Sequence, residues 1–196
     1  MKTYDELQFI QWAGKIGIEP DAGYPKSAIL RFKPDPKLDR FWIIPGKPEL
    51  RPYFLARMLD LLGDWDSCWI WRHMGSWHKE PHDDWNSKVE FQILAGIGLP
   101  MGTAAILEFS RSEIDRLITL LFSTTAFGWS VGEDLYLVPD NAQYLIEVSH
   151  HEVIHVSFRR ETDLEQYVTE MAVSGFPLPE AVPDATFKTP DWMKKD

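Results

Sequence analysis

The segment DLYLVPDNAQYLIEVSHHEVIHVSF, residues 134–158, decides the fold because it holds three strand-like runs separated by two turns. The runs Asp134–Val138, Tyr144–Ser149 and Val153–Phe158 are rich in aliphatic, aromatic and β-branched residues, which are typical of strands. Pro139-Asp140-Asn141 favours a turn, because proline fixes φ and the Asx side chains bond their own backbone. The segment therefore predicts an antiparallel β-meander.

Outside this segment the chain alternates between further strands and helices. Four more runs predict strands, at Ala28–Phe32, Phe41–Ile44, Ser67–Arg72 and Ala104–Phe109. Three Ser/Thr-x-x-Glu capping boxes predict helix starts, at Thr3/Glu6, Ser110/Glu113 and Thr162/Glu165. The predicted helices run from Thr3 to about Ile16, over Glu49–Leu62, over Arg111–Thr124 and over Asp163–Ser174. We therefore expect an α+β fold with a mixed or mainly antiparallel sheet packed with about four helices, ending in the β-meander and a helix.

The chain length suits one compact domain. The sequence has 196 residues, and a chain of this size can bury about 70% of its unfolded surface without disulfides or metals. We predict a single α+β domain over residues 1–176. The remaining residues, 177–196, are expected to form an extended tail because they contain Pro177, Pro179, Pro183 and Pro190.

Two segments, about 25–75 and about 100–160, share an order of features that suggests an internal duplication. Residues 28–32 and 105–109 both read A-I-L-x-F, and each run is followed by an amphipathic helix. Each helix ends at a glycine close to a tryptophan, and an aromatic strand follows. Convergent patterning of two strand–helix–strand units explains the likeness equally well, so both interpretations stay open.

The composition excludes several classes of function. The net charge of −10 and the lack of a long Lys/Arg block argue against a nucleic-acid binder, and they favour a basic protein partner. Apolar runs such as Ile93–Leu99 are too short to span a bilayer, and no secretion signal is visible. The single cysteine, Cys68, is expected to be a small buried hydrophobic residue in a reducing compartment. We therefore predict a soluble, cytoplasmic protein that contacts neither membrane nor nucleic acid.

The sequence His151-Glu152-Val153-Ile154-His155 matches the H-E-x-x-H motif of zinc proteases. That chemistry needs a helix, which places both histidines on one face and one turn apart. Strand-like residues flank the motif here, and positions four apart along a strand are separated by roughly 13 Å. We therefore interpret the motif as part of a β-hairpin.

A second group of potential metal ligands lies in the segment from His73 to Asp84. Imidazole and carboxylate groups together suit zinc or another transition metal. The ligands of such a site are His73, His78, His82, Asp83 and Asp84. Their spacing matches no familiar ligand pattern, so a solvated loop that carries incidental histidines is the alternative.

Tryptophan is concentrated in one part of the chain. Six of the nine tryptophans lie between Trp42 and Trp85, and tryptophan is enriched at the centres of protein interfaces. Trp69 and Trp71 share one face of their predicted strand. Packing in the core explains each tryptophan taken alone. The predicted binding surface consists of Trp69, Trp71, His73, Trp77, His78, His82 and Trp85.

The β-meander, the following helix and Gly175-Phe176-Pro177-Leu178-Pro179 together resemble small bacterial proteins of the toxin-immunity kind. The resemblance implies a compact, acidic, non-catalytic protein and assigns no residues. Phosphate-binding glycine loops and a nucleophile elbow are absent from the sequence. We therefore expect a non-enzymatic protein-binding or inhibitory module without a cofactor. A metal-dependent hydrolase that uses the His73–Asp84 loop and a self-associating structural protein are the alternatives.

Overall fold

The computed structural model describes residues 1–20, 30–72, 77, 80–81, 83–99, 102, 106–127, 134–149 and 152–180. Its strands are β1 Lys2–Tyr4, β2 Ile18–Pro20, β3 Leu30–Phe32, β4 Asp39–Ile43, β5 Ser67–Arg72, β6 Ile106–Ser110, β7 Leu135–Pro139, β8 Tyr144–Ser149 and β9 Val153–Phe158. Its α-helices are α1 Glu6–Lys15, α2 Arg51–Asp60, α3 Trp85–Gly96, α4 Ile114–Phe127 and α5 Glu161–Val173. The predicted α+β class is confirmed, with one α-helix more than expected.

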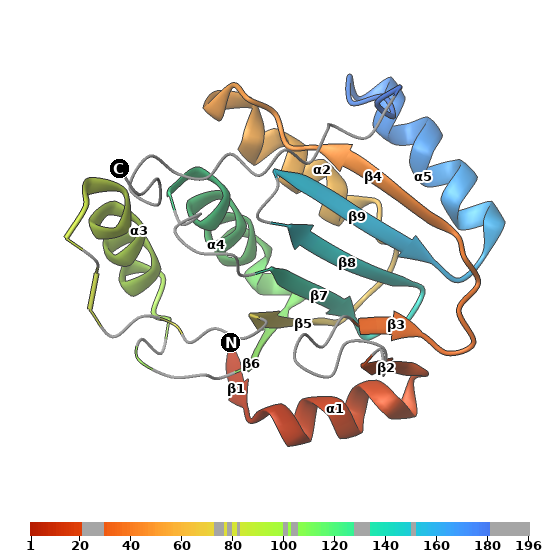
Figure 1. The fold of residues 1–196 in the computed structure, drawn as a ribbon, viewed down its shortest axis with the longest axis horizontal. Coiled ribbons are helices and arrows are strands. Elements are labelled where there is room, and N and C mark those ends of the chain that lie inside the picture. The colour runs from red at the N-terminus through yellow and green to blue at the C-terminus, as the bar shows by residue number, and fades with distance from the viewer. Residues whose placement is uncertain are drawn as a thin grey trace, which may run out of the picture.

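Seven of the strands form one antiparallel sheet in the order β1-β6-β5-β7-β8-β9-β4. The predicted β-meander is its β7-β8-β9 portion, and β4 forms one end of the sheet (Figure 1). β2 and β3 make a separate two-stranded sheet. Because β4 pairs only with β9 in the part of the chain that the structure describes, it is an edge strand.

The large sheet separates two hydrophobic cores, because successive side chains of a strand point to opposite faces. In β5, Cys68 and Ile70 belong to the core beneath α2, α4 and α5, whereas Trp69 and Trp71 belong to the core beneath α1 and β2–β3. Trp69 and Trp71 therefore share a face, as predicted. Cys68 is fully buried, which confirms the prediction that it is a small buried hydrophobic residue.

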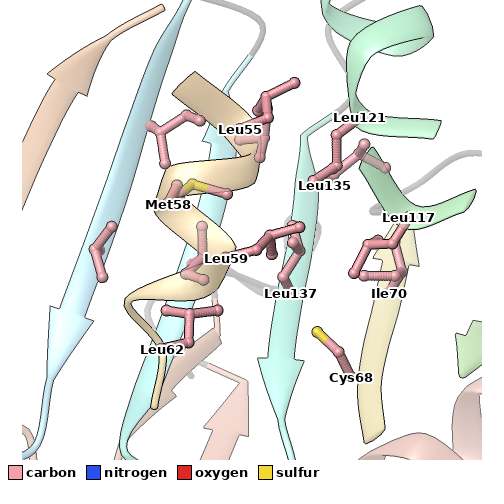
Figure 2. Packing of buried hydrophobic residues seen from close by; sticks show 14 of the residues in the cluster. Leu55, Met58, Leu59, Leu62, Cys68, Ile70, Leu117, Leu121, Leu135 and Leu137 are labelled. Carbon is pink, nitrogen blue, oxygen red and sulfur yellow. The ribbon is translucent and has the colours of Figure 1, made fainter. Parts of the chain in front are cut away.

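The larger core contains a layer of aliphatic side chains between α2, α4 and the sheet. Figure 2 shows Leu55, Met58 and Leu59 of α2, and Leu62 just after the helix, projecting toward the strands, with Leu137 of β7 among the side chains that they face. All five side chains are at most 1% exposed. Burial of each contributes about 1.5–3 kcal/mol, so this layer supplies much of the stabilisation of the fold.

The smaller core, on the α1 side of the sheet, is dominated by aromatic rings. Trp69 stacks on Trp12 of α1 with ring centroids 4.5 Å apart, and on Tyr4 at 4.3 Å. The buried sheet residues of this core come from β5, β6, β7 and β8, and none comes from β9 or β4. Figure 1 shows α1 and β2–β3 beside the β5 to β8 part of the sheet. Among the described residues, the α1-side face of β9 and β4 therefore lies beyond the packed core.

The predicted helix starts are partly right. Ser110 and Glu113 form the expected capping box at the 3-10 turn Arg111–Glu113, which leads into α4. The predicted box at Thr3 is wrong, because Thr3 lies in β1 and pairs with β6; Asp5 caps α1 instead, together with Gln8. The box at Thr162 is also wrong, because α5 begins at Glu161 without a side-chain cap.

Helix α3 was not predicted, although its start carries a recognisable signal. The carboxylate of Asp84 accepts a hydrogen bond from the backbone N–H of Ser87, as an N-cap residue does. The apolar residues of α3 do not gather on one clear face, so the helical period is weak in the sequence. Helix α3 ends at Gly96, and Gly98 follows at a positive φ.

The two segments of the suggested duplication have different structural surroundings. The A-I-L-x-F run at 28–32 ends in β3 of the small sheet, whereas the run at 105–109 lies mostly in β6 of the large sheet. In the predicted tail, Pro177–Glu180 has no regular secondary structure, and residues 181–196 lie outside the described residues. None of the helices in the described ranges is both long and apolar enough to cross a membrane.

Candidate functional site: the β4 end of the sheet

A row of directly opposed residues crosses the α1-side face of the sheet and leads from its packed part to the β9–β4 end, which the smaller core does not reach among the described residues. Trp71 opposes Tyr136, and Tyr136 opposes Glu147. Glu147 in turn opposes His155, which opposes Phe41 on the edge strand β4. Cβ atoms of directly opposed residues lie about 4.5–5.5 Å apart. The carboxyl group of Glu147 on β8 therefore lies between the phenol of Tyr136 on β7 and the imidazole of His155 on β9. Glu147 is two strands away from the edge strand β4.

Glu147 is the most strongly perturbed acid in this row. The pKa of its carboxyl group is raised from 4.5 to about 7, mainly by burial and secondly by the nearby charge of Asp134. A hydrogen bond with Tyr136 and the charge of Arg31 act in the opposite direction on the pKa. A carboxyl group with a pKa near neutrality takes up or releases a proton in the physiological range. The same environment raises the pKa of the Tyr136 hydroxyl, so this phenol stays protonated.

Along the sheet edge, the backbone of β4 has outward hydrogen-bonding groups that pair with no other strand in the described ranges. The N–H of Phe158 donates to the Leu38 carbonyl, and the N–H of Ile44 donates to the Glu152 carbonyl, both at 2.9 Å. In an antiparallel pair such bonds recur at every second residue. The N–H and C=O groups of the odd-numbered residues Asp39, Phe41 and Ile43 therefore point away from β9. We call these three residues the β4 edge.

The side chains of the β4 edge lie on the α1-side face of the sheet, and those of Phe41 and Ile43 are apolar. Ile43 is 46% exposed, and Phe41 is half-buried. The ring of Phe41 lies 6.2 Å from the ring of His155. At the start of the strand, Nη1 of Arg40 donates to the Asp39 carbonyl at 2.7 Å, so the outward carbonyl there has a partner within the chain. The open part of the edge therefore extends from Phe41 to Ile43.

Three of the four tryptophans of the predicted binding surface are buried. Trp69, Trp71 and Trp77 are 6%, 4% and 1% exposed, so a partner cannot reach their rings without a rearrangement of the core. Trp85 is 76% exposed at the first turn of α3, and a partner can contact it directly. His73, His78 and His82 lie outside the described residues.

The two acids of the predicted metal site have other partners. Asp84 caps α3, and Asp83 forms an ion pair with Lys88 at 2.5 Å. Among the described residues, no group of three or more His, Cys, Asp or Glu side chains has the arrangement of a metal site. The three histidines of that prediction lie outside these residues, so the metal hypothesis stays a prediction.

The H-E-x-x-H sequence forms part of a hairpin, as predicted. His155 lies in β9, which pairs with β8, and Glu152 adopts a positive φ of 61° in the connection that precedes β9. The first histidine, His151, is outside the described residues. The zinc-protease arrangement needs a helix between the two histidines, and the motif residues Val153, Ile154 and His155 lie in a strand instead.

Comparison with protein-family models, with curated proteins and with solved structures finds no match for this chain. The site must therefore be interpreted from its own residues. Sequence reasoning did not single out Glu147 or the β4 edge. The signal for Glu147 was a lone acid among the apolar residues of Tyr144–Ser149, within a predicted central strand of the meander. No comparable signal marked β4 as an edge strand, because strand order depends on the tertiary fold.

Proposed function

We propose that this protein is a protein-binding module and that its contact surface is the β4 edge together with His155. The observation that supports the proposal most strongly is Ile43, which is 46% exposed on a strand that pairs only with β9 in the part of the chain that the structure describes. Edge strands of this kind readily pair with another chain, and proteins often protect them with lysine, proline or a covering element. From Phe41 to Ile43, β4 contains neither lysine nor proline.

The charge of the protein supports a partner with a basic surface. The net charge is −10, which accelerates the association of positively charged proteins. The same charge opposes the association of two copies of this chain, because each copy repels the other. A heterologous partner is therefore the occupant that we propose for the β4 edge.

The proposal is tested by capture of a partner on immobilised protein, with three variants compared in parallel. Ile43→Lys places a charge on the exposed edge, where lysine is well tolerated. Leu7→Lys makes the same change at another exposed apolar residue, on α1, since Leu7 is 66% exposed. Trp85→Ala removes the exposed tryptophan of the segment that the sequence indicated. Circular dichroism and thermal unfolding first establish that each variant is folded.

We expect a stoichiometric partner to bind the wild type, Leu7→Lys and Trp85→Ala, and not Ile43→Lys. Loss of the partner from Trp85→Ala alone would place the contact surface at α3 and refute the proposal. The mass of the protein in solution tests the remaining alternative. A dimer that Ile43→Lys converts to monomers would make a second copy of this chain the occupant, which also contradicts the proposed partner.

A further inference from the structure

We propose that the β4 edge binds an extended, positively charged segment of the partner as an additional β-strand, with backbone pairing at Phe41 and Ile43. This inference rests on the proposed function and specifies both the binding mode and the chemistry of the partner. Strand addition of this kind derives affinity from backbone hydrogen bonds and specificity from alternate side chains.

The alternation of hydrogen bonds between β4 and β9 fixes the positions that the added strand uses. Arg40, Trp42 and Ile44 direct their backbone groups toward β9, as the bonds at Leu38 and Ile44 require. Phe41 and Ile43 direct theirs to the outside. The side chain of Arg40 already donates to the Asp39 carbonyl. The added strand therefore forms its complete set of backbone hydrogen bonds from Phe41 onward. The contact surface thus offers two outward N–H groups and two outward C=O groups.

The side chains of the edge specify what the added strand carries on the same face. Opposed residues lie on one face of a sheet, so residues opposite Phe41 and Ile43 meet apolar surface. A residue opposite Asp39 meets an exposed carboxylate. The partner segment therefore carries two apolar side chains at alternate positions and Lys or Arg at the next alternate position, in either chain direction. A positive segment also matches the net charge of −10.

The chemistry is tested with a library of random ten-residue peptides displayed on phage. The library is selected on the wild-type protein and counter-selected on Ile43→Lys. Selected peptides are expected to alternate apolar residues and to contain Lys or Arg two positions beyond an apolar pair. Acidic peptides, peptides with apolar residues at helical spacing, or a lack of enrichment would each overturn the inference.

The binding mode is tested by amide hydrogen exchange, measured by NMR on the full chain with a selected peptide. In the free protein, the amides of Phe41 and Ile43 are expected to exchange faster than those of Arg40 and Trp42, which bond to β9. The peptide is expected to slow exchange at Phe41 and Ile43 by at least about tenfold, because each amide then donates within a sheet. Unchanged exchange at both residues in the complex would overturn strand addition.

A matched pair of substitutions separates failure of this inference from failure of the proposed function. Ile43→Pro removes the outward N–H and leaves the bonds to β9 in place, since proline is accepted on an edge strand whose N–H faces solvent. Ile43→Val keeps both the N–H and a β-branched apolar side chain. We expect Ile43→Val to bind the peptide within about threefold of wild type and Ile43→Pro to lose at least about tenfold, or 1.4 kcal/mol. Equal binding by Ile43→Pro and wild type, with loss in Ile43→Lys, would refute strand addition and leave the binding surface intact.

Discussion

Replacing Glu147 with glutamine is expected to stabilise the protein, and the effect should depend on pH. The carboxyl group has a pKa of about 7 in the folded chain, against an ordinary value of 4.5. Between these two values the folded chain binds more protons at this residue than the unfolded chain. Stability contributed by Glu147 is therefore greatest below about pH 4.5 and falls as the pH rises through 7.

The size of the effect follows from the difference between the two pKa values. At about 1.4 kcal/mol for each pH unit, the penalty of the ionised carboxylate reaches about 3 kcal/mol above pH 7. Glu147 is half-buried, so solvent reduces this value, and we expect about 1–2 kcal/mol. Glutamine carries no charge, and its amide carbonyl can still accept a hydrogen bond from the Tyr136 hydroxyl.

Urea unfolding of the wild type and Glu147→Gln at pH 5 and pH 8 measures this difference. We expect the two proteins to have similar free energies of unfolding at pH 5 and the variant to be more stable at pH 8. Glu165→Gln, at an exposed position of α5, controls for the general loss of one negative charge.

One result would refute the reasoning. If Glu147→Gln were less stable than the wild type at pH 8, the ionised carboxylate would be stabilised by its neighbours rather than penalised by burial. Arg31 is the group whose charge acts in that direction. Glu147 would then form an ion pair with Arg31 of β3, and the pKa of Glu147 would lie below its ordinary value.

Three further predictions concern the core, the single thiol and one helix cap. Leu59→Ala should lower the free energy of unfolding, measured by urea unfolding, by about 2–5 kcal/mol, because Leu59 is fully buried on the inner face of α2. A change below about 1 kcal/mol would contradict the packing in Figure 2. Cys68 is fully buried and its pKa is raised by burial, so Ellman's reagent should detect no thiol in the native protein and one after denaturation; rapid native labelling would show an open core. Asp5→Ala should cost about 1 kcal/mol in thermal unfolding, whereas Thr3→Ala should cost less, because Asp5 caps α1; the reverse order would restore the cap predicted from sequence.

The strands of the meander were predictable because their residues have a strong local preference for strands. Tyr144–Ser149 and Val153–Phe158 have the predicted bounds in the structure, and both are dense in β-branched or aliphatic residues. Ser110 was predictable as a cap because its hydroxyl and the Glu113 carboxylate act within one turn. Thr3 carried the same signal, yet it pairs with Leu107 of β6 instead. Tertiary pairing determined the structure there, and a short-range pattern contains no information about it.

The candidate site was not predictable, since it depends on the order of strands in the sheet. Phe41 and Ile43 read as part of an ordinary strand, and only the position of β4 at the end of the sheet leaves their outward backbone groups open. Trp69 and Trp71 were assigned correctly to one face of one strand. Their burial arises because α1 covers that face, with Phe9 lying 5.6 Å from Trp71. Sequence spacing identifies the face of a strand but not what packs against it.

The central claim is that the β4 edge is the surface that binds a partner. Calorimetric titration of the captured partner into the wild type, Ile43→Lys and Trp85→Ala tests it most directly. The account predicts that Ile43→Lys weakens binding by at least about tenfold, or 1.4 kcal/mol, and that Trp85→Ala binds like the wild type. Wild-type affinity in Ile43→Lys would contradict the account.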